Sequence, residues 1–248
     1  MQSRLDAWVR QIGGKVASGL SVALIGTGLL AGAAVPALAI PEADAIKKLQ
    51  VIPVFVITDA KGVPLPIPRD KALVLPLYLE SAKANQELAA LVKSNPQLKA
   101  SVVAVPLNVM NEKVAELNKQ LKDKSKPLVA PVVGNARDRQ QAATLLKAQG
   151  LTDQQIQDGL SVPVFFTKPF LTLNTPEGPR GVFFLSYEEL QAALAKLPAA
   201  ERDKLKPQVA DLSAVLREII KASSDTYVIY PTPEYFRLVQ ETKAKSGK

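Results

Sequence analysis

The chain contains nearly the same apolar stretch twice, and this repetition limits its possible folds more than any other feature. "IPVFVIT" begins at Ile52 and "VPVFFT" begins at Val162. Further matches follow in the same order, at a spacing that falls from 110 to 100 residues: Pro53 and Pro163, Leu79 and Leu185, Leu91 and Leu197, Leu107 and Leu212, Asn108 and Ser213, and Pro131 and Pro231. Shorter connections in a second copy would reduce the spacing in this way, so the sequence predicts a duplicated unit.

Apolar runs and helical patterns recur in the same order in both copies and predict an α/β (α+β) fold. Each unit has few strands, so we expect two similar strand-helix units packed into one body with pseudo-twofold symmetry. Strands are expected at 51–58, 72–79, 101–107, 127–133, 162–167, 182–185, 208–212 and 226–231. Helices are expected at 41–49, 81–94, 108–121, 136–149, 186–197, 213–222 and 233–244.

Polar residues at several expected helix starts predict N-caps. Asn108 and Ser213 each precede a helical pattern, and Ser186 and Glu189 have the spacing of a capping box. Pro233 is suited to the first turn of the last helix.

The first 39 residues have the pattern of a secretory signal peptide. A basic start is followed by the uncharged apolar run 16–35 and then by "PALA", so cleavage is expected between Ala39 and Ile40. The alternative is an uncleaved membrane anchor, because the run is long enough to be considered. The predicted division is a signal peptide at 1–39, a first α/β unit with an N-terminal helix at 40–160, and a second unit with a basic tail at 161–248.

Cysteine and histidine are both absent, which limits the chemistry that the chain can perform. Disulfides, imidazole catalysis and histidine metal ligands are excluded. Glu188 and Glu189 are neighbours on a helix and do not face each other, and Ser81 and Lys83 likewise point apart. We therefore predict no enzyme activity, no catalytic or metal-binding residue and no cofactor.

The net charge of +8 becomes +6 without residues 1–39. This charge is compatible with contact to an anionic membrane surface or an acidic partner, and nucleic acid is not expected for an exported protein.

Aromatic residues are concentrated in the second unit and form the candidate binding residues. Side chains alternate between the faces of a strand, so neighbouring phenylalanines cannot enter one core face. Either both faces of the sheet are covered, which we favour, or one member of each pair lines a groove for extended polypeptide. The candidate polypeptide-binding residues are Phe165, Phe166, Phe183, Phe184, Tyr230, Tyr235 and Phe236.

Four stretches together resemble the Tic-twenty-two family, the twenty-two-kilodalton subunit of the chloroplast inner-envelope translocon. They are "VIPVFVITDAKG", "LVLPLYLESAKANQELAAL", "VVAVPLNVMNEKV" and "VPVFFTKPFLTLN" with "GVFFLSYEELQAAL". The resemblance covers about residues 40–240, and the bacterial-type leader suggests a cyanobacterial rather than a plastid member. It implies a butterfly-like two-unit fold and a chaperone-like role in passing precursor polypeptides across an intermembrane or periplasmic space. It also implies a role in outer-membrane biogenesis beside the β-barrel insertase.

We therefore expect a periplasmic, chaperone-like protein-transport factor that binds precursor polypeptides without catalysis. The thylakoid lumen is left open as a second location. The alternatives are a passive structural subunit of an envelope translocon complex and, from another class, a hydrolase that uses carboxylates alone.

Overall fold

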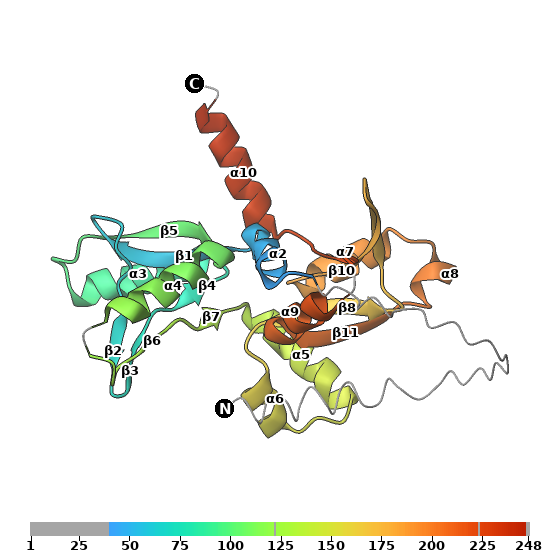
Figure 1. Cartoon of the computed structure of the whole chain (residues 1–248), viewed down its shortest axis with the longest axis horizontal. Helices are drawn as coiled ribbons and strands as arrows, with labels where there is room; N and C mark the ends of the chain where they lie inside the picture. Colours follow the sequence, from blue (N-terminus) through green and yellow to red (C-terminus); the bar gives the residue numbers. More distant parts are fainter. Residues whose placement is uncertain (1–39, 122, 223, 247–248) are drawn as a thin grey trace, which may run out of the picture.

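The computed structural model describes residues 40–121, 123–222 and 224–246. The predicted leader and Ala39 of the cleavage site lie outside these residues. Figure 1 shows two lobes side by side, with α2 (Glu42–Lys47) between them and α10 (Pro233–Ser246) rising from the middle. The first lobe runs from 53 to 133 and the second from 136 to 229.

The first lobe contains two small sheets. A four-stranded sheet has the order β5-β1-β4-β7 and a three-stranded sheet the order β2-β3-β6. A short 3-10 helix, η1 (Lys48–Val51), precedes it. Its elements are β1 (Pro53–Asp59), β2 (Ile67–Arg69), β3 (Ala72–Val74), β4 (Leu77–Tyr78), α3 (Ser81–Ser94), β5 (Ala100–Pro106), α4 (Leu107–Gln120), β6 (Leu128–Val129) and β7 (Val132–Val133).

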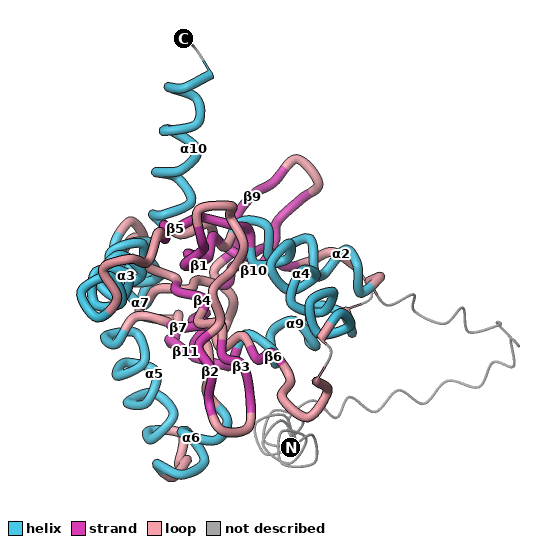
Figure 2. The backbone as a smooth tube through the Cα atoms, turned by 90° about the vertical axis from the view of Figure 1, so that its left-hand side faces the viewer, coloured by secondary structure: helices cyan, strands magenta, loops and turns pink. Residues whose placement is uncertain are grey.

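The second lobe also divides into two sheets, β12-β10-β9 and β11-β8. A bridge between Phe165 and Phe184 joins them. Its elements are α5 (Ala136–Ala148), α6 (Asp153–Gly159), β8 (Pro163–Lys168), β9 (Thr172–Thr175), β10 (Gly178–Phe183), α7 (Tyr187–Ala195), α8 (Ala199–Arg202), β11 (Lys206–Asp211), α9 (Leu212–Lys221) and β12 (Tyr227–Ile229). Figure 2 shows the helices around a central group of strands, which confirms the expected α/β class.

Both lobes contribute to one hydrophobic core. This shared core contains, among its buried residues, Val54, Leu77 and Leu107 from the first lobe and Val164, Phe183 and Ile219 from the second. A separate cluster on the outer side of each lobe contains Phe55 and Tyr78 in the first and Phe165 and Leu190 in the second. Strands in both lobes are thus covered on both faces, and the two lobes form one body.

Strand pairing in the two lobes corresponds residue by residue. The N–H of Leu107 donates to the carbonyl of Ile52, and the N–H of Leu212 donates to that of Val162, each at 2.9 Å. Matching cross-strand pairs are Pro53–Pro106 with Pro163–Asp211, Phe55–Tyr78 with Phe165–Phe184, and Leu77–Val132 with Phe183–Ile229. Because Val132 corresponds to Ile229, Pro131 corresponds to Val228. The expected match of Pro131 with Pro231 is therefore wrong by three residues. Pseudo-twofold symmetry of the lobes stays a prediction.

Two expected strands are each interrupted at a proline. The run 72–79 is divided into β3 and β4 at Pro76, and the run 127–133 into β6 and β7 at Pro131. The first parts pair in the three-stranded sheet and the second parts in the four-stranded sheet. Proline cannot donate a ladder hydrogen bond, so each strand passes from one sheet to the next at this residue.

The expected N-caps at Asn108 and Ser213 are wrong, and the capping box expected at Ser186 and Glu189 is not formed although Ser186 is the N-cap residue of α7. Helix α4 begins one residue before Asn108, whose Oδ1 is buried and has no hydrogen-bond partner among the described residues. Helix α9 is capped by Asp211, whose Oδ1 accepts from the N–H of Ser213 at 2.9 Å. Ser186 stands at the start of α7 but its side chain makes no capping hydrogen bond, so Glu189 completes no capping box.

Candidate polypeptide-binding groove

The phenylalanine pairs of the second lobe lie on opposite faces of its strands. Phe165 and Phe184 pack in the outer cluster, while Phe183 lies in the shared core and the half-buried Phe166 packs against it. This confirms that the two faces are both covered. Phe165, Phe183 and Phe184 are at most 3% exposed, so they are inaccessible in this conformation. Their binding of polypeptide therefore stays a prediction that would require the lobe to open.

The other three candidate residues gather at the base of α10. The ring of Tyr230 lies 5.3 Å from that of Phe184 and 6.2 Å from that of Phe236, and Tyr235 lies 5.9 Å from Phe236. Phe236 is 42% exposed. These rings connect the outer cluster of the second lobe to the surface where α10 begins.

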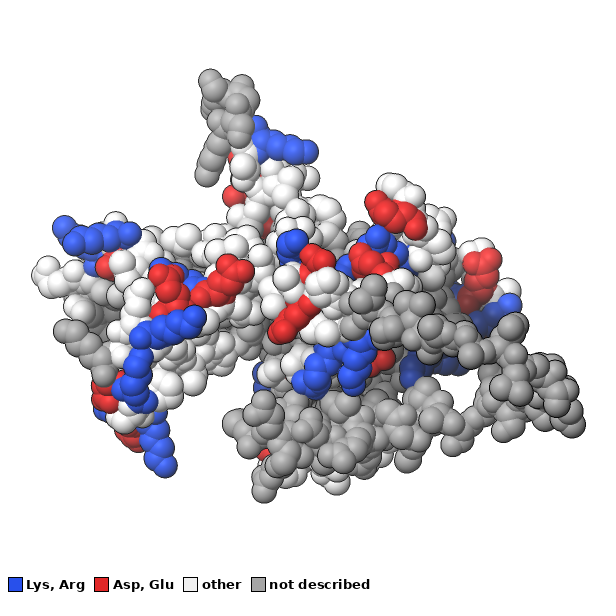
Figure 3. Space-filling model, in the orientation of Figure 1, with Lys and Arg blue, Asp and Glu red and all other residues white. Residues whose placement is uncertain are grey.

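An apolar groove of about 510 Å³ lies between α10 and the C-terminal end of β5. Figure 1 shows β5 at the upper margin of the first lobe with α10 rising beside it, and Figure 3 shows a largely uncharged surface there. The groove is lined by Gln50, Pro53, Ala104, Val105, Pro106, Tyr235, Leu238, Val239, Thr242 and Lys243. Of the seven aromatic candidates, this groove includes Tyr235.

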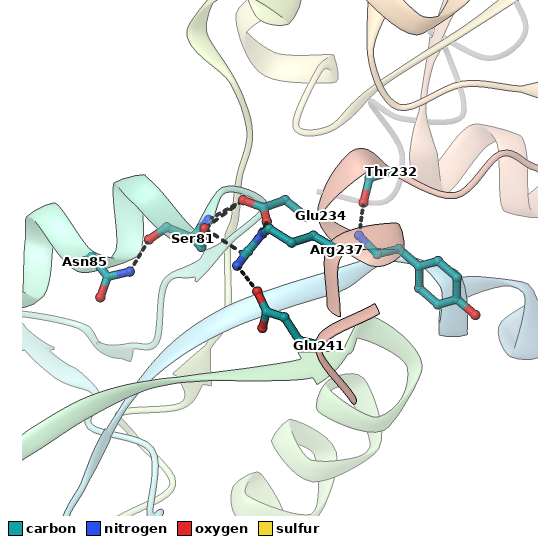
Figure 4. Close-up of polar contacts among 7 residues, drawn as sticks. Ser81, Asn85, Thr232, Glu234, Arg237 and Glu241 are labelled. Carbon is teal, nitrogen blue, oxygen red and sulfur yellow. Dashed lines mark hydrogen bonds and ion pairs between the residues drawn. The ribbon is translucent and has the colours of Figure 1, made fainter. Parts of the chain in front are cut away.

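A carboxylate of α10 holds the helix beside the first lobe (Figure 4). Oε1 of Glu234 accepts from the N–H and the hydroxyl of Ser81, at 3.1 and 2.8 Å. Ser81 is the first residue of α3, so Glu234 caps a helix of the first lobe. Arg237 donates to Glu234 at 2.9 Å and to Glu241 at 2.8 Å. Burial acts to raise the pKa of Glu234, but the hydrogen bonds from Arg237 and Ser81 outweigh burial and hold this pKa below its ordinary value.

The second lobe contains a matching contact. Oδ1 of Asp138 on α5 accepts from the N–H of Tyr187, the first residue of α7, at 2.8 Å. Tyr187 follows Ser81 at the same spacing, 106 residues, as Leu185 follows Leu79. Helix α3 of the first lobe is therefore capped by a carboxylate of α10, which follows the strands of the second lobe. Helix α7 of the second lobe is capped by a carboxylate of α5, which follows the strands of the first lobe.

A second cleft, of about 450 Å³, lies between the lobes and is lined by several carboxylates, among them Glu80, Asp138, Glu188 and Glu234. Burial raises the pKa of Asp138, against the hydrogen bond from Tyr187. Burial, and then the charges of Asp138 and Glu188, raise the pKa of Glu189 to about 7. The cleft thus holds acidic groups that repel one another.

The residues considered for catalysis are not assembled into a reactive pair. Glu188 is exposed while Glu189 is half-buried, and the hydroxyl of Ser81 is bonded to Glu234. Lys83 pairs with Glu87 at 2.8 Å. Across the described residues, no group of three or more acidic side chains is placed to hold a metal ion.

Sequence reasoning missed the groove itself. Its α10 wall consists of Tyr235, Leu238, Val239, Thr242 and Lys243, which recur at steps of three, one, three and one residues. This spacing places them on one helical face and was a usable signal. The position of that face against β5 depends on tertiary packing, which no local pattern indicates.

Comparison with known proteins gives one family. The sequence profile of the Tic22-like family matches residues 2–241. No curated protein matches the chain. Within the described part of the chain, no helix is long and apolar enough to cross a membrane.

Two solved structures share the fold. Tic22 from Anabaena, described as a protein-transport protein, has a TM-score of 0.66 at 21% identity, covering 82% of this chain and 97% of its own. Tic22 from Plasmodium falciparum has a TM-score of 0.62 at 16% identity, covering 81% and 98%.

Proposed function

The chain belongs to the Tic22-like family, and on that premise we propose that it is a chaperone-like factor of protein transport that binds precursor polypeptides without catalysis. The similar Anabaena protein is described by a role in protein transport. The observation that carries the proposal is the apolar groove beside β5, which lies at the surface and is bounded by half-buried apolar side chains. Unfolded precursors expose apolar segments, and such a groove can bind them with little dependence on sequence.

Export to the periplasm is the second part of the proposal, with the thylakoid lumen as the other location. The N–H of Ile40 lies 3.2 Å from the carbonyl of Ala222, at the C-terminus of α9. Cleavage after Ala39 would place a positive α-amino group at this helix end, where the helix dipole favours a cation. N-terminal sequencing of the protein from fractionated cells is expected to begin at Ile40.

The implied partners are unfolded precursors and the β-barrel insertase of the outer membrane, with peripheral contact to the membrane. A passive structural subunit of an envelope complex would crosslink in cells to one fixed partner. A chaperone-like factor is expected to crosslink to many precursors.

Suppression of aggregation tests the proposal directly. Residues 40–248 are mixed with an outer-membrane β-barrel protein diluted from urea, and light scattering is recorded. We expect suppression by the unchanged protein and at least a fivefold weaker effect for Val239→Glu, which places a charge in the groove. Val92→Glu, at an exposed position of α3 outside the groove lining, is the matched control. A groove variant as active as this control would contradict the site, and no suppression by the unchanged protein would contradict the function.

A further inference from the structure

Strand β5 differs from the other edge strands that the structure describes. It has seven residues, "ASVVAVP", with no charged side chain, and Val103 is 38% exposed. The other edge strands are shorter, and β2 and β11 each contain a proline. Natural proteins usually protect edge strands by shortness, charge or proline, because an open edge pairs with other chains. Apart from Pro106 at its end, β5 has none of these protections.

The unused main-chain groups of β5 can be assigned from the ladder. The N–H of Leu107 donates to Ile52 at 2.9 Å, and β5 pairs with β1 in regular antiparallel register. Hydrogen-bonded and non-hydrogen-bonded pairs alternate along such a ladder. The N–H and C=O groups of Val102 and Ala104 therefore point away from β1, toward the free side of the sheet.

The matching strand of the second lobe is protected at the same place. The hydrogen bond from Leu212 to Val162 sets the same alternation in β11, which directs the backbone of Pro207 outward. Pro207 corresponds to Val102 at the spacing of Leu212 from Leu107 and has no N–H to offer. Helix α5 also packs against β8 and β11, while α10 leaves a groove beside β5.

We propose that the free edge of β5 accepts an extended apolar segment of an unfolded polypeptide as an additional strand. The main chain of the segment pairs with Val102 and Ala104, and a side chain near its end enters the groove under α10. Pairing through main-chain groups explains how many sequences can be bound. This inference rests on the proposed function and specifies how its clients are held.

The occupant is a single extended chain rather than a second folded copy. A helix of fourteen residues is about 21 Å long, and α10 rises beside the C-terminal end of β5 (Figure 1). A second copy pairing edge to edge would have to bring its own lobe past this helix. An additional strand needs only about 5 Å beside β5.

The test copies the protection of the second lobe. Val102→Pro removes the outward N–H but none of the hydrogen bonds to β1, and Val102→Ala retains the N–H as the matched control. Affinity for the fluorescently labelled, urea-unfolded β-barrel protein is measured by anisotropy. We expect Val102→Pro to weaken binding at least tenfold and Val102→Ala to change it less than threefold. Equal affinity of both variants, with Val239→Glu still weakened, would overturn strand addition and leave the proposed function standing.

Hydrogen exchange of the unchanged protein keeps the test independent of how the proline variant folds. The amides of Val102 and Ala104 should exchange quickly when free and at least tenfold more slowly with client bound. Unchanged exchange would reject the proposal. Light scattering after size exclusion tests whether a second copy of the protein occupies the edge of β5 instead. A dimer that forms without client and that Val102→Pro abolishes would overturn the proposal in favour of this second copy. Absence of client binding by the unchanged protein would reject the proposed function itself.

Discussion

Two carboxylates cap helices that are distant from them in sequence, each from the helix that follows the strands of the other lobe. Glu234 accepts from Ser81 at the start of α3, and Asp138 accepts from Tyr187 at the start of α7. The first N–H groups of a helix have no partner within the helix, so a carboxylate from another element can satisfy them. Both contacts are distant in sequence, and no pattern at either helix start indicates them.

Removing one of these caps should cost about as much as removing a local N-cap, about 1 kcal/mol. We expect Glu234→Ala to lower the Tm by about 2–4 °C. Glu241→Ala, which removes an exposed carboxylate that pairs with the same Arg237, should change the Tm by less than 1 °C, because exposed ion pairs contribute little. Differential scanning calorimetry compares the two. Equal effects would mean that the capping of α3 contributes no stability.

Glu189 makes stability depend on pH in the opposite direction to an ion-paired carboxylate. Burial, with Asp138 and Glu188 nearby, raises its pKa to about 7 from the ordinary value of 4.5. Between these two values the folded state binds more protons than the unfolded state, so the free energy of unfolding decreases as pH rises. The raised pKa of Asp138 acts in the same direction.

Glu189→Gln should therefore stabilise the protein at pH 8 and leave it nearly unchanged at pH 4.5. Because Glu189 is only half-buried, solvent screening reduces the expected gain to about 1 kcal/mol, or about 2–4 °C in Tm. Thermal unfolding at both pH values checks this. The pH dependence that remains in the variant includes the raised pKa of Asp138 and the lowered pKa of Glu234, which act in opposite directions. A variant with an unchanged Tm at pH 8 would show that Glu189 is ionised without penalty.

At the scale of elements, periodicity predicted the existence of elements better than their ends. The helices at 81–94 and 136–149 agree with α3 and α5 within one residue. The division of 72–79 at Pro76 depends on two sheets that the sequence does not show. Helix α6 was not expected, although Thr152 and Gln155 form the capping box at its start. The start of α6 could therefore be predicted from the local sequence, whereas the division of the strand at Pro76 depends on how the two sheets pair in the folded protein.

The same distinction applies to the candidate site. Aromatic excess drew attention to Phe165, Phe183 and Phe184, which are buried because both faces of their sheet are covered. The groove is instead bounded mainly by smaller apolar residues on β5 and α10, with Tyr235 beside them. Composition identifies where apolar area is concentrated, but it does not tell which part of that area stays at the surface.

Helix α10 should be separable from the rest of the fold. It projects from the body and contacts it mainly near its first two turns, through Glu234 and Leu238. Ending the chain after Thr232 should lower the Tm by a few degrees, because the cap and the half-buried Tyr235, Leu238 and Val239 are lost. Suppression of aggregation should fall to the level of Val239→Glu.

Circular dichroism shows whether the chain that ends after Thr232 still folds. The shortened chain should lose helical signal corresponding to α10 and retain a cooperative transition. A chain that no longer folds would show that α10 is part of the core and would remove its role as one wall of a binding groove.

At the scale of the whole molecule, the two lobes are related by corresponding strand registers and by reciprocal caps. These correspondences favour the duplication, which stays a prediction, as does the boundary at residues 160 and 161. Helix α5, assigned to the first unit by the sequence, packs in the outer cluster of the second lobe, and Leu238 of α10 packs in that of the first. The helix after each group of strands thus packs on the other lobe.

The shared core and this exchange of helices imply that the lobes unfold together. Leu77 lies in the shared core and Leu190 in the outer cluster of the second lobe, and both are fully buried. Leu77→Ala and Leu190→Ala should each cost about 2–5 kcal/mol, the range for a buried leucine. Each should lower one common urea transition, with amide protection lost in both lobes at the same urea concentration. Two separate transitions, with Leu190→Ala affecting the second lobe alone, would mean that the lobes fold independently despite the core that they share.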